Sequence, residues 1–591
     1  MALRMSSRPP VRPLRAFALA LVLLGTLLAS VPASAGTTTL QVSASDLLVE
    51  FGEAVTLAVV LDGEAACLEG RTVMLEWRPA DSGGFATVGS GTTSAAGTVS
   101  IQQIQPHTGR YRGSASSSDA CPAATSEEVL VRVRAFVDAS VVAGPGSVGS
   151  CVDVYASVQP ARPGQIADLQ RRIEGTWVTI EQLTLDPLSS ALAAPCFGFA
   201  DIGVVRLRVR WLAQDPLNET DSSPTLAFEI VPAPWMDAIE DAIGGRSVSM
   251  AVGEEDTYLY DRDAAQARIP ASNTKLLLSM AMLDAFGPDL QIRTSAAASA
   301  IEDSGVVEDL WILGRGDPNV SDPTIGALAR ELADAGVTRV RGRVMGSTGY
   351  FKRDWYAPGW NDVARDYVNR PTALTFDGND IADPERRAAE VLVQRLEALG
   401  IGVAGRPGSG SPPSGLATLA SVTSEPLQTL LQKLLRPSDN FAAEVLGKLL
   451  GVESSGTPGT IAKGAAAIEA FTDGHGADFT INDNSGLSYA NRVTARGIVR
   501  LLWVAEDATW YGDLRRALPT GGQGTLRDRL HGIRVRAKTG TLTDVSALSG
   551  WVFSEGTGTW IEFSILCSGM SKTTASAIED EIVAILAHEL G

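Results

Sequence analysis

Residues 270–277 read Pro270-Ala271-Ser272-Asn273-Thr274-Lys275-Leu276-Leu277, and the chain then stays largely apolar through Leu283. Proline suits the opening turn of a helix, because its missing N–H would be unpaired there anyway. The run behind it is apolar on nearly every side, which predicts a buried central helix. Ser272 and Lys275 are three residues apart, so they share one helical face and lie within reach of each other. The alternative is an ordinary helix that begins with a polar turn.

Two more short motifs follow, Ser438-Asp439-Asn440 and Lys538-Thr539-Gly540. Before the second of them, Ile533, Val535 and Ala537 alternate with Arg534, Arg536 and Lys538, a pattern typical of a strand with one wet face. Strand-like runs at 547–554 and 559–568 flank a glycine-containing turn, so the motif is expected on an antiparallel sheet. Gly540 is expected to let a substrate backbone come close.

Together the three motifs carry the parts of an acyl-transfer site. Serine is a poor nucleophile until a base removes its proton. Lys275 is the candidate base if burial and the second cation, Lys538, keep it neutral. Ser438 is expected to pass the proton to the leaving amine, while Asn440 anchors Lys275 and the substrate amide. No histidine lies in a motif, since the four present are His107, His475, His531 and His588.

The motifs resemble those of class C low-molecular-mass penicillin-binding proteins, the D-alanyl-D-alanine carboxypeptidase/endopeptidase family. The same resemblance extends to Asp483-Asn484-Ser485-Gly486-Leu487-Ser488, to Gly524-Thr525-Leu526 and to Arg529, and it covers residues 233–591. It implies hydrolysis of stem peptides ending in D-Ala-D-Ala, or of cross-bridges, through an acyl-enzyme on Ser272. It also implies covalent inhibition by β-lactams.

The resemblance implies further roles around the nucleophile. The main-chain amides of Ser272 and Thr541 would stabilise the oxyanion. Thr539, with Lys538, would bind the terminal carboxylate of the substrate. The implied fold is an α/β (α+β) serine transpeptidase/β-lactamase-like catalytic domain, an antiparallel sheet with helices, over residues 233–296 and 420–591.

Residues 297–419 separate the first two motifs and are expected to form an inserted α/β subdomain, with helices at 325–335 and 388–399. Within it, Asp362 and Tyr367 resemble a segment that the family uses to read the diamino acid of the stem peptide. Asp362 would pair with a side-chain ammonium and Tyr367 would pack against its stem. The alternative is a loop whose aspartate caps a helix. Tyr489 and Thr543 stand where the family has arginine and glutamine, which leaves the stem-peptide preference open.

The first 35 residues have arginines, then an apolar run, then Ala33-Ser34-Ala35, as in a secretory signal peptide. The mature chain is expected outside the cell, in the periplasm or in the wall space, without a transmembrane anchor. Residues 37–135 and 136–232 alternate apolar and polar positions and predict two immunoglobulin-like β-sandwiches. One disulfide is expected in each: the first half holds Cys67 and Cys121, and the second holds Cys151 and Cys196. Cys567 is expected to be a buried thiol.

The charge and the residue composition limit the kinds of partner that the protein is expected to bind. The 591 residues carry a formal net charge of −19, which disfavours nucleic acid. No histidine or cysteine pair has metal-ligand spacing, so neither metal nor cofactor is expected. Two other functions stay open at this level: a β-lactamase or esterase on the same fold, and a non-enzymatic wall-binding protein.

Overall fold

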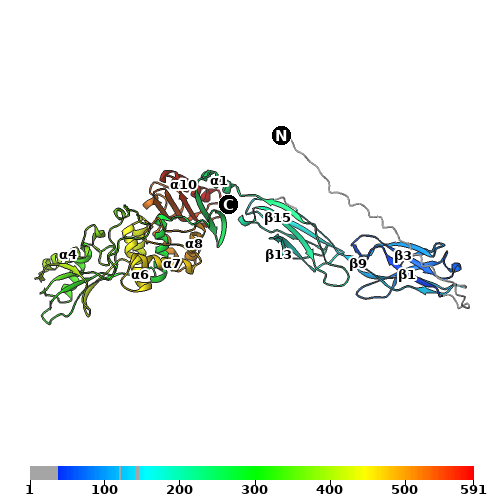
Figure 1. Cartoon of the computed structure of the whole chain (residues 1–591), viewed down its shortest axis with the longest axis horizontal. Coiled ribbons are helices and arrows are strands. Elements are labelled where there is room, and N and C mark those ends of the chain that lie inside the picture. The colour runs from blue at the N-terminus through cyan, green and yellow to red at the C-terminus, as the bar shows by residue number, and fades with distance from the viewer. Residues whose placement is uncertain (1–36, 119–120, 142–145, 591) are drawn as a thin grey trace. The chain divides into compact units, whose positions relative to one another are not determined.

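The computed structural model describes residues 37–118, 121–141 and 146–590, so the expected signal peptide lies outside the described residues (Figure 1). The chain divides into two compact units. The second unit contains all of Phe228–Gly591 and also the short segments Gly144–Val152 and Pro195–Val205. Among the described helices, none combines the length and the apolar composition that a membrane crossing requires.

Residues 39–134 form two β-sheets that share one core. Leu57 from the first sheet and Leu75, Tyr111 and Val131 from the second lie in the same buried cluster. Alternate residues of β3 are buried, as expected for a strand with one face on a core. The first sheet has the order β1 (Thr39–Ala44), β3 (Val55–Asp62), β6 (Thr98–Gln103). The second has the order β2 (Leu48–Glu50), β9 (Val129–Arg134), β7 (Gly109–Ala115), β4 (Thr72–Pro79), β5 (Ala86–Thr92), with β8 (Ala124–Thr125) beside β7.

The next stretch, residues 136–230, is also all β. Its smaller sheet has the order β10 (Phe136–Val141), β11 (Val154–Gln159), β14 (Ser190–Ala193). Its larger sheet has the order β13 (Thr176–Thr184), β12 (Ile166–Ile173), β15 (Gly203–Trp211), β16 (Asp221–Ser222), with β17 (Leu226–Ile230) beside β15. Cys67 is bonded to Cys121 and Cys151 to Cys196. Cys567 is a buried free thiol, and burial raises its pKa to about 12.

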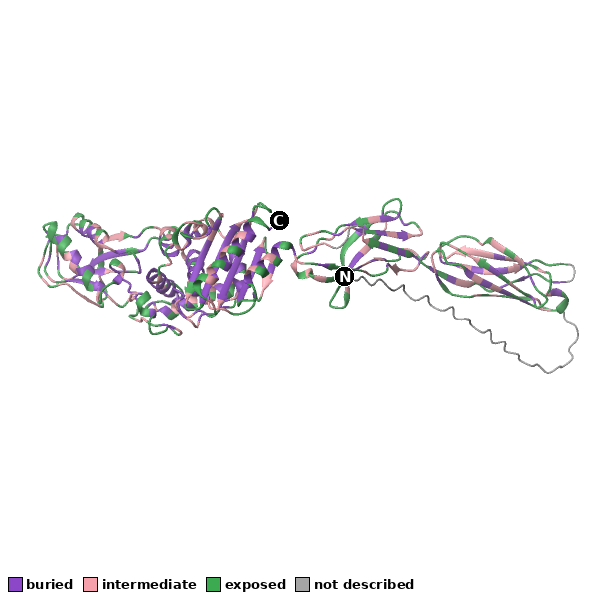
Figure 2. Cartoon of the chain, turned by 90° about the horizontal axis from the view of Figure 1, so that it is seen from above, coloured by how far each residue is buried: buried purple, intermediate pink, exposed green. Residues whose placement is uncertain are grey.

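The second unit is built on a five-stranded antiparallel sheet. Its order is β19 (Thr257–Arg262), β18 (Val248–Glu254), β30 (Trp560–Ser568), β29 (Val545–Phe553), β28 (Val535–Leu542). The three C-terminal strands lie where the sequence predicts them. Most residues of these strands are buried on both faces (Figure 2), so helices must cover both sides of the sheet.

Two helical layers supply that cover. On one face α1 (Pro234–Ile243) and α10 (Lys572–His588) pack with β18, β29 and β30 in one core cluster. The other face belongs to a second cluster with α8 (Ala495–Asp507) and α2 (Thr274–Phe286). That cluster also includes α5 (Leu427–Leu435), α6 (Asn440–Ser455), α7 (Ile461–Gly474) and α9 (Tyr511–Ala517). Thr274 through Leu283 are all buried, which confirms the predicted central helix.

The region between the first two motifs has its own core, formed by a five-stranded sheet and two helices. The sheet has the order β26 (Gly408–Gly410), β24 (Val344–Ser347), β22 (Leu310–Leu313), β20 (Arg293–Ala298), β27 (Ala417–Thr423). It therefore begins and ends a few residues outside the expected limits of 297 and 419. The helices are α3 (Asp322–Asp334) and α4 (Pro384–Ala398), and a small parallel sheet joins β21 (Val306–Val307), β23 (Arg339–Val340) and β25 (Gly402–Val403).

The first disulfide closes a loop with a sequence separation of 54 residues, and such a cross-link limits the unfolded chain. We expect replacement of both Cys67 and Cys121 by serine to lower the free energy of unfolding of residues 39–134 by about 3 kcal/mol. Calorimetry of the full chain would show one transition shifted downward. Cys567→Ala is the control, because it leaves that cross-link intact. An unmoved transition in the double variant would contradict the expectation.

Candidate active site

Ser272 lies in a short 3-10 turn, Ala271–Asn273, directly before α2. Two glycines from other motifs pack closely against this turn. A Cβ atom on Gly486 would lie 1.9 Å from the Ala271 carbonyl oxygen, and one on Gly540 would lie 2.6 Å from the Pro270 carbonyl oxygen. Both positions therefore require glycine. For Gly540 the reason differs from the expected approach of substrate, because the residue is buried against the nucleophile's own turn.

Lys275 is completely buried and points at the nucleophile. Its Nζ atom donates to Ser272 Oγ at 3.0 Å, to Asn440 Oδ1 at 2.6 Å and to the Ser485 carbonyl oxygen at 2.5 Å. One contact comes from each of three motifs that are far apart in sequence. A buried ammonium needs such acceptors, and every one of them holds the amine beside the serine.

Ser438 and Asn440 reach the site from the start of α6. Asp439 is the N-cap of this helix and accepts from the Ala442 N–H at 3.0 Å. Ser438 adopts a positive φ of 64°, which turns the chain sharply just before the cap. Asn440 contacts Lys275 through its oxygen, while its Nδ2 donates to the Tyr367 carbonyl oxygen at 3.0 Å.

Lys538 is also completely buried, so the expectation of a wet strand face is wrong at this position. Its Nζ donates to Ser438 Oγ at 2.9 Å and to the Thr539 carbonyl oxygen at 2.7 Å. The hydroxyl of Thr539 bonds Thr525 Oγ1 at 2.7 Å. Lys538 thus contacts the second motif of the site rather than solvent.

One face of α6 supports the site through residues four apart, Asn440, Glu444 and Lys448. Glu444 is buried and accepts from the N–H groups of Asn484 at 3.1 Å and Ser485 at 2.9 Å. Ser485 in turn offers its carbonyl oxygen to Lys275. Glu444 therefore positions an acceptor of the candidate base.

Lys448 performs a similar task one turn further along α6. Its buried Nζ donates to the carbonyl oxygens of Lys352 at 2.9 Å, Asp354 at 3.1 Å and Pro371 at 3.0 Å. It also lies 2.7 Å from an Asp354 carboxylate oxygen. These bonds tie both ends of segment 352–371 to α6, and that segment carries Asp362 and Tyr367.

Asp483 organises the remaining loop of the site. Its carboxylate accepts from the N–H groups of Gly486 at 3.0 Å and Ser488 at 2.9 Å, and from Trp360 Nε1 at 2.8 Å. The hydrogen bonds to Asp483 thereby fix the turn that holds Gly486 against Ala271. Tyr489, one of the two positions that depart from the family pattern, accepts at its hydroxyl from the N–H of the other, Thr543, at 3.1 Å.

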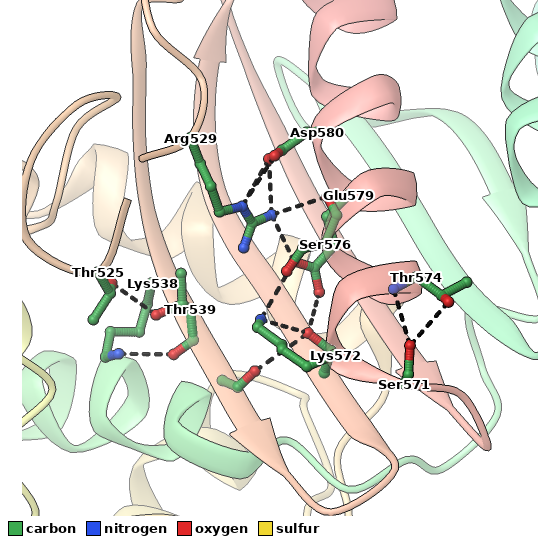
Figure 3. A network of polar contacts seen from close by, with 12 residues as sticks. Thr525, Arg529, Lys538, Thr539, Ser571, Lys572, Thr574, Ser576, Glu579 and Asp580 are labelled. Carbon is green, nitrogen blue, oxygen red and sulfur yellow. Dashed lines mark hydrogen bonds and ion pairs between the residues drawn. The ribbon is translucent and has the colours of Figure 1, made fainter. Parts of the chain in front are cut away.

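A charged network borders the site on the side of α10 (Figure 3). Arg529 Nη2 lies 2.8 Å from Glu579 Oε2, and its Nε donates to Asp580 at 2.9 Å. Lys572 Nζ donates to Ser546 Oγ at 3.0 Å, and that hydroxyl donates to Glu579 Oε1 at 2.6 Å. Two cations are therefore held beside the site by two carboxylates.

Burial brings the uncharged form of the amine next to the nucleophile within reach of neutral pH. Burial lowers the pKa of Lys275 to about 8, although Asp483 and Glu444 oppose the shift. Burial, and then the charge of Lys275, hold the pKa of Lys538 well below its ordinary value. Burial also raises the pKa of Glu444 to about 7, with Asp483 adding to the rise.

These elements enclose a cleft of about 260 Å³ lined by Ser272, Ser438, Asn440, Thr525, Arg529, Thr539, Thr541 and Lys572. The two lysines Lys275 and Lys538 lie beneath it, wholly covered. Asp362 and Tyr367 are exposed, and no hydrogen bond or ion pair joins the Asp362 side chain to a described residue. Only the main chain of Tyr367 reaches the site, through Asn440.

Glu444, Lys448 and Lys572 are site residues that sequence reasoning did not assign. Glu444 and Lys448 had a usable signal, because two ionisable residues stand inside an otherwise apolar helix, one and two turns after Asn440. Lys572 had none, since a lysine at the start of a surface helix is ordinary.

A serine and a buried lysine, set between a helical layer and an antiparallel sheet, define a serine acyl-transfer enzyme of the penicillin-binding type. The chain matches the D-Ala-D-Ala carboxypeptidase 3 (S13) family over residues 236–382 and 379–589. It is 31% identical over 451 residues to a D-alanyl-D-alanine carboxypeptidase of an Actinomadura species, covering 60% of this chain and 83% of the relative. It is 28% identical over 379 residues to carboxypeptidase DacB of Mycolicibacterium smegmatis, covering 58% and 80%.

The fold of penicillin binding protein 4 (dacB) from Haemophilus influenzae is also similar, with a TM-score of 0.53 and 19% identity over 59% of this chain and 99% of that one. The chain belongs to the D-Ala-D-Ala carboxypeptidase 3 (S13) family. It is a serine-type, penicillin-binding D-alanyl-D-alanine carboxypeptidase, which confirms the class expected from the sequence.

Lys448→Met should free segment 352–371, because three carbonyl groups lose their donor and Asp354 loses its cation. We expect a loss of about 3 kcal/mol in stability and faster amide hydrogen exchange in that segment. Lys433→Met is the matched control: this lysine is exposed and paired with exposed Glu425, so its loss should cost under about 1 kcal/mol. Unchanged exchange in segment 352–371 would show that Lys448 does not hold it.

Proposed function

We propose that Ser272 is the nucleophile of this carboxypeptidase and that neutral Lys275 is its base. The observation that carries the proposal is the 3.0 Å contact between Lys275 Nζ and Ser272 Oγ at a fully buried lysine. As Oγ bonds to the carbonyl carbon of the penultimate D-alanine, its proton moves to Lys275 Nζ. The main-chain amides of Ser272 and Thr541, two residues of the same cleft, would stabilise the negative oxygen.

The second step breaks the C–N bond and needs a proton on the leaving amine. Ser438 is proposed to supply it, taking a proton from Lys275 in exchange. Its hydroxyl already accepts from Lys538, which leaves the O–H free to point into the cleft. Water then attacks the carbonyl carbon of the acyl-enzyme and gives a proton to Lys275; the bond from that carbon to Ser272 Oγ breaks, Oγ takes the proton back from Lys275, and the shortened peptide leaves. Asn440 orients Lys275 throughout and is proposed to contact the substrate amide.

The terminal carboxylate of the substrate is proposed to meet Thr539. Lys538 would act on it only through the electric field and through Thr539, because its Nζ is buried and bonded elsewhere. Arg529 and Lys572 line the same cleft and add positive charge there. Carboxylate recognition in this site is thus shared between a hydroxyl and cations that face the cleft.

Substrate specificity beyond D-alanine is proposed to involve Asp362 and Tyr367. Support comes from the bond between Asn440 Nδ2 and the Tyr367 carbonyl oxygen, which places their segment beside the second motif. Cross-bridge cleavage is proposed as an additional activity, since it needs the same acyl-enzyme with a larger leaving amine.

The organisation of the chain outside the site is proposed from the same sequence patterns. Residues 1–35 are proposed as a cleaved export signal, placing the enzyme on the substrate's side of the membrane. Residues 37–135 and 136–232 are proposed as immunoglobulin-like domains, supported by their paired sheets and one disulfide each. Residues 297–419 are proposed as the inserted subdomain between 233–296 and 420–591.

The test of the nucleophile and base is labelling by a fluorescent penicillin across pH. With a lysine pKa of about 8, the rate should rise about tenfold per pH unit below pH 8 and level off above it. Protonation removes the base, so the activity is lost as the pH falls. Ser272→Ala and Lys275→Ala should each abolish stable labelling while circular dichroism shows a folded protein, with the lower melting temperature in Lys275→Ala because Asn440 and Ser485 lose a buried donor. Labelling that persists in Lys275→Ala, or a flat profile from pH 6 to pH 9, would remove Lys275 as the base.

The recognition role is tested with Asp362→Asn. This change should lower kcat/KM about fivefold for stem peptides with a free diamino-acid ammonium, because an exposed ion pair is lost. Peptides whose ammonium is acetylated should be cleaved as before. Asp366→Asn, on the same exposed turn, is the control. Equal losses on both peptides would argue against the role.

A further inference from the structure

The face of β28 that carries Lys538 continues as a line of arginines. Residues two apart along a strand share one face, so Arg536 follows Lys538 at roughly 7 Å, and Arg534 lies one residue before β28, where its carbonyl oxygen accepts from the Phe553 N–H at 2.9 Å. The burial of these side chains decreases along the line: Lys538 is buried, Arg536 is half-buried and Arg534 is exposed. The strand that bears Lys538 thus leads outward from the site along a positively charged face.

Two arginines from neighbouring elements join this line. Arg436 stands two residues before Ser438, and its Nη2 donates to the Arg516 carbonyl oxygen at 3.1 Å. Arg515 stacks on Trp560 with its guanidinium carbon 3.5 Å from the ring centre, and Arg534 stacks on Phe553 at the same distance. Stacking fixes the planes of these guanidinium groups, and apart from Arg515 Nη1, which donates to Tyr511 Oη at 3.2 Å, their N–H groups can donate to a ligand.

These arginines lack counter-ions. Arg436, Arg515, Arg534 and Arg536 form no ion pair with any residue that the structure describes, whereas nearby Arg516 pairs with Asp513. Burial and the charges of Arg436 and Arg515 lower the pKa of Arg536, so the groups are close enough to repel one another. In a protein with a net charge of −19, a cluster of four arginines without counter-ions gives this surface a local positive potential that attracts anions.

Two hollows lie along the cluster. One, of about 400 Å³, is lined by Arg515, Arg516, Arg534, Arg536 and Trp560 among others. The other, of about 690 Å³, is lined by Arg436, Pro437, Gly524, Thr525, Arg527, Asp528 and Arg529. Thr525 and Arg529 also line the catalytic cleft, and Figure 3 shows Thr525 bonded to Thr539. The second hollow therefore opens from the end of the cleft at which Thr539 lies.

That end is the leaving-group side, if the proposed function is right. Thr541 would meet the oxyanion and Thr539 the carboxylate of the departing residue, so the departing group extends toward the N-terminal end of β28. When the leaving group is a single D-alanine, its carboxylate at Thr539 is the last group in the cleft. A longer leaving group must continue toward Arg436 and Arg536.

We propose that these arginines form a binding groove for an acidic leaving peptide, namely the stem peptide that is released when a cross-bridge is cut. This inference rests on the proposed function of Ser272 and Lys275. Guanidinium groups bind carboxylates through paired hydrogen bonds, and a leaving stem peptide carries several carboxylates. The groove makes the enzyme an endopeptidase as well as a carboxypeptidase, because only the larger leaving group reaches it.

The test compares two substrates across matched variants of the full-length enzyme. The substrates are a purified cross-linked muropeptide dimer and a monomer that ends in D-Ala-D-Ala. Arg536→Gln should lower kcat/KM for the dimer about fivefold, and Arg534→Gln with Arg536→Gln about tenfold or more. Cleavage of the monomer should stay within about twofold. Arg536→Lys should restore part of the loss, and Arg339→Gln, an exposed arginine of β23, should change neither substrate.

Two further readouts separate charge from shape. Wild-type cleavage of the dimer should fall as salt is raised, toward the level of Arg536→Gln. A dimer whose leaving strand has amidated carboxyl groups should lose the advantage that the arginines provide, so wild type and Arg536→Gln should cleave it equally.

Other outcomes would overturn the inference. Equal losses on dimer and monomer would mean that Arg536 only supports the fold, and no loss on either would mean that the groove is unused. Unchanged dimer cleavage together with lost binding of a fluorescent polyphosphate would assign the arginines to a phosphate polymer instead. If wild type cleaves the monomer and never the dimer, the groove proposal fails alone. If penicillin labels nothing and neither substrate is cleaved, the proposed function fails with it.

Discussion

The 3.0 Å contact between Ser272 Oγ, which lines the cleft, and Nζ of the fully buried Lys275 constrains the rest of the catalytic unit. Removing an ammonium from water costs several kcal/mol, so the amine must have acceptors in place or lose its proton. The protein does both. Asn440 and Ser485 supply acceptors, and burial lowers the pKa of the amine to about 8. The residues around Lys275 therefore serve stability and reactivity through the same contacts.

Helix α6 connects the parts that meet at this lysine. Its first residue, Asn440, touches Lys275, and its next turn carries Glu444, which fixes the loop that offers the Ser485 carbonyl. One turn further, Lys448 ties down the segment that reaches back to Asn440 through Tyr367. A rigid helix is well suited to this task, because residues four apart keep a constant spacing. The active site is thus supported by one helical face rather than by loops alone.

Charge is distributed unevenly over the catalytic unit. The protein is acidic overall, yet beside the cleft Arg436, Arg515, Arg534 and Arg536 form no ion pair with any residue that the structure describes. The cations nearer the nucleophile are different, since Arg529 and Lys572 are paired with Glu579 and Asp580 while they line the cleft. The inner pair suits a small carboxylate and the outer cluster suits a longer anion. This division provides a physical basis for handling both a single amino acid and a peptide as leaving groups.

The sequence by itself determined the chemistry and the local elements of this protein. The order of three motifs, an apolar run after Ser272 and alternation before Lys538 were enough to predict the central helix, the antiparallel strands and an acyl-transfer site, because these signals are local, and the resemblance of the motifs to a known family added the enzyme class. The tertiary structure alone decided how the elements meet. Alternation suggested that Lys538 faces water, but the lysine is buried and bonded to Ser438. Gly540 must be glycine because the turn at Pro270 packs against it. Glu444 and Lys448 support the site because α6 packs against loops distant in sequence. Burial and pKa depend on neighbours that only folding brings together, and periodicity along one strand or helix contains no information about them.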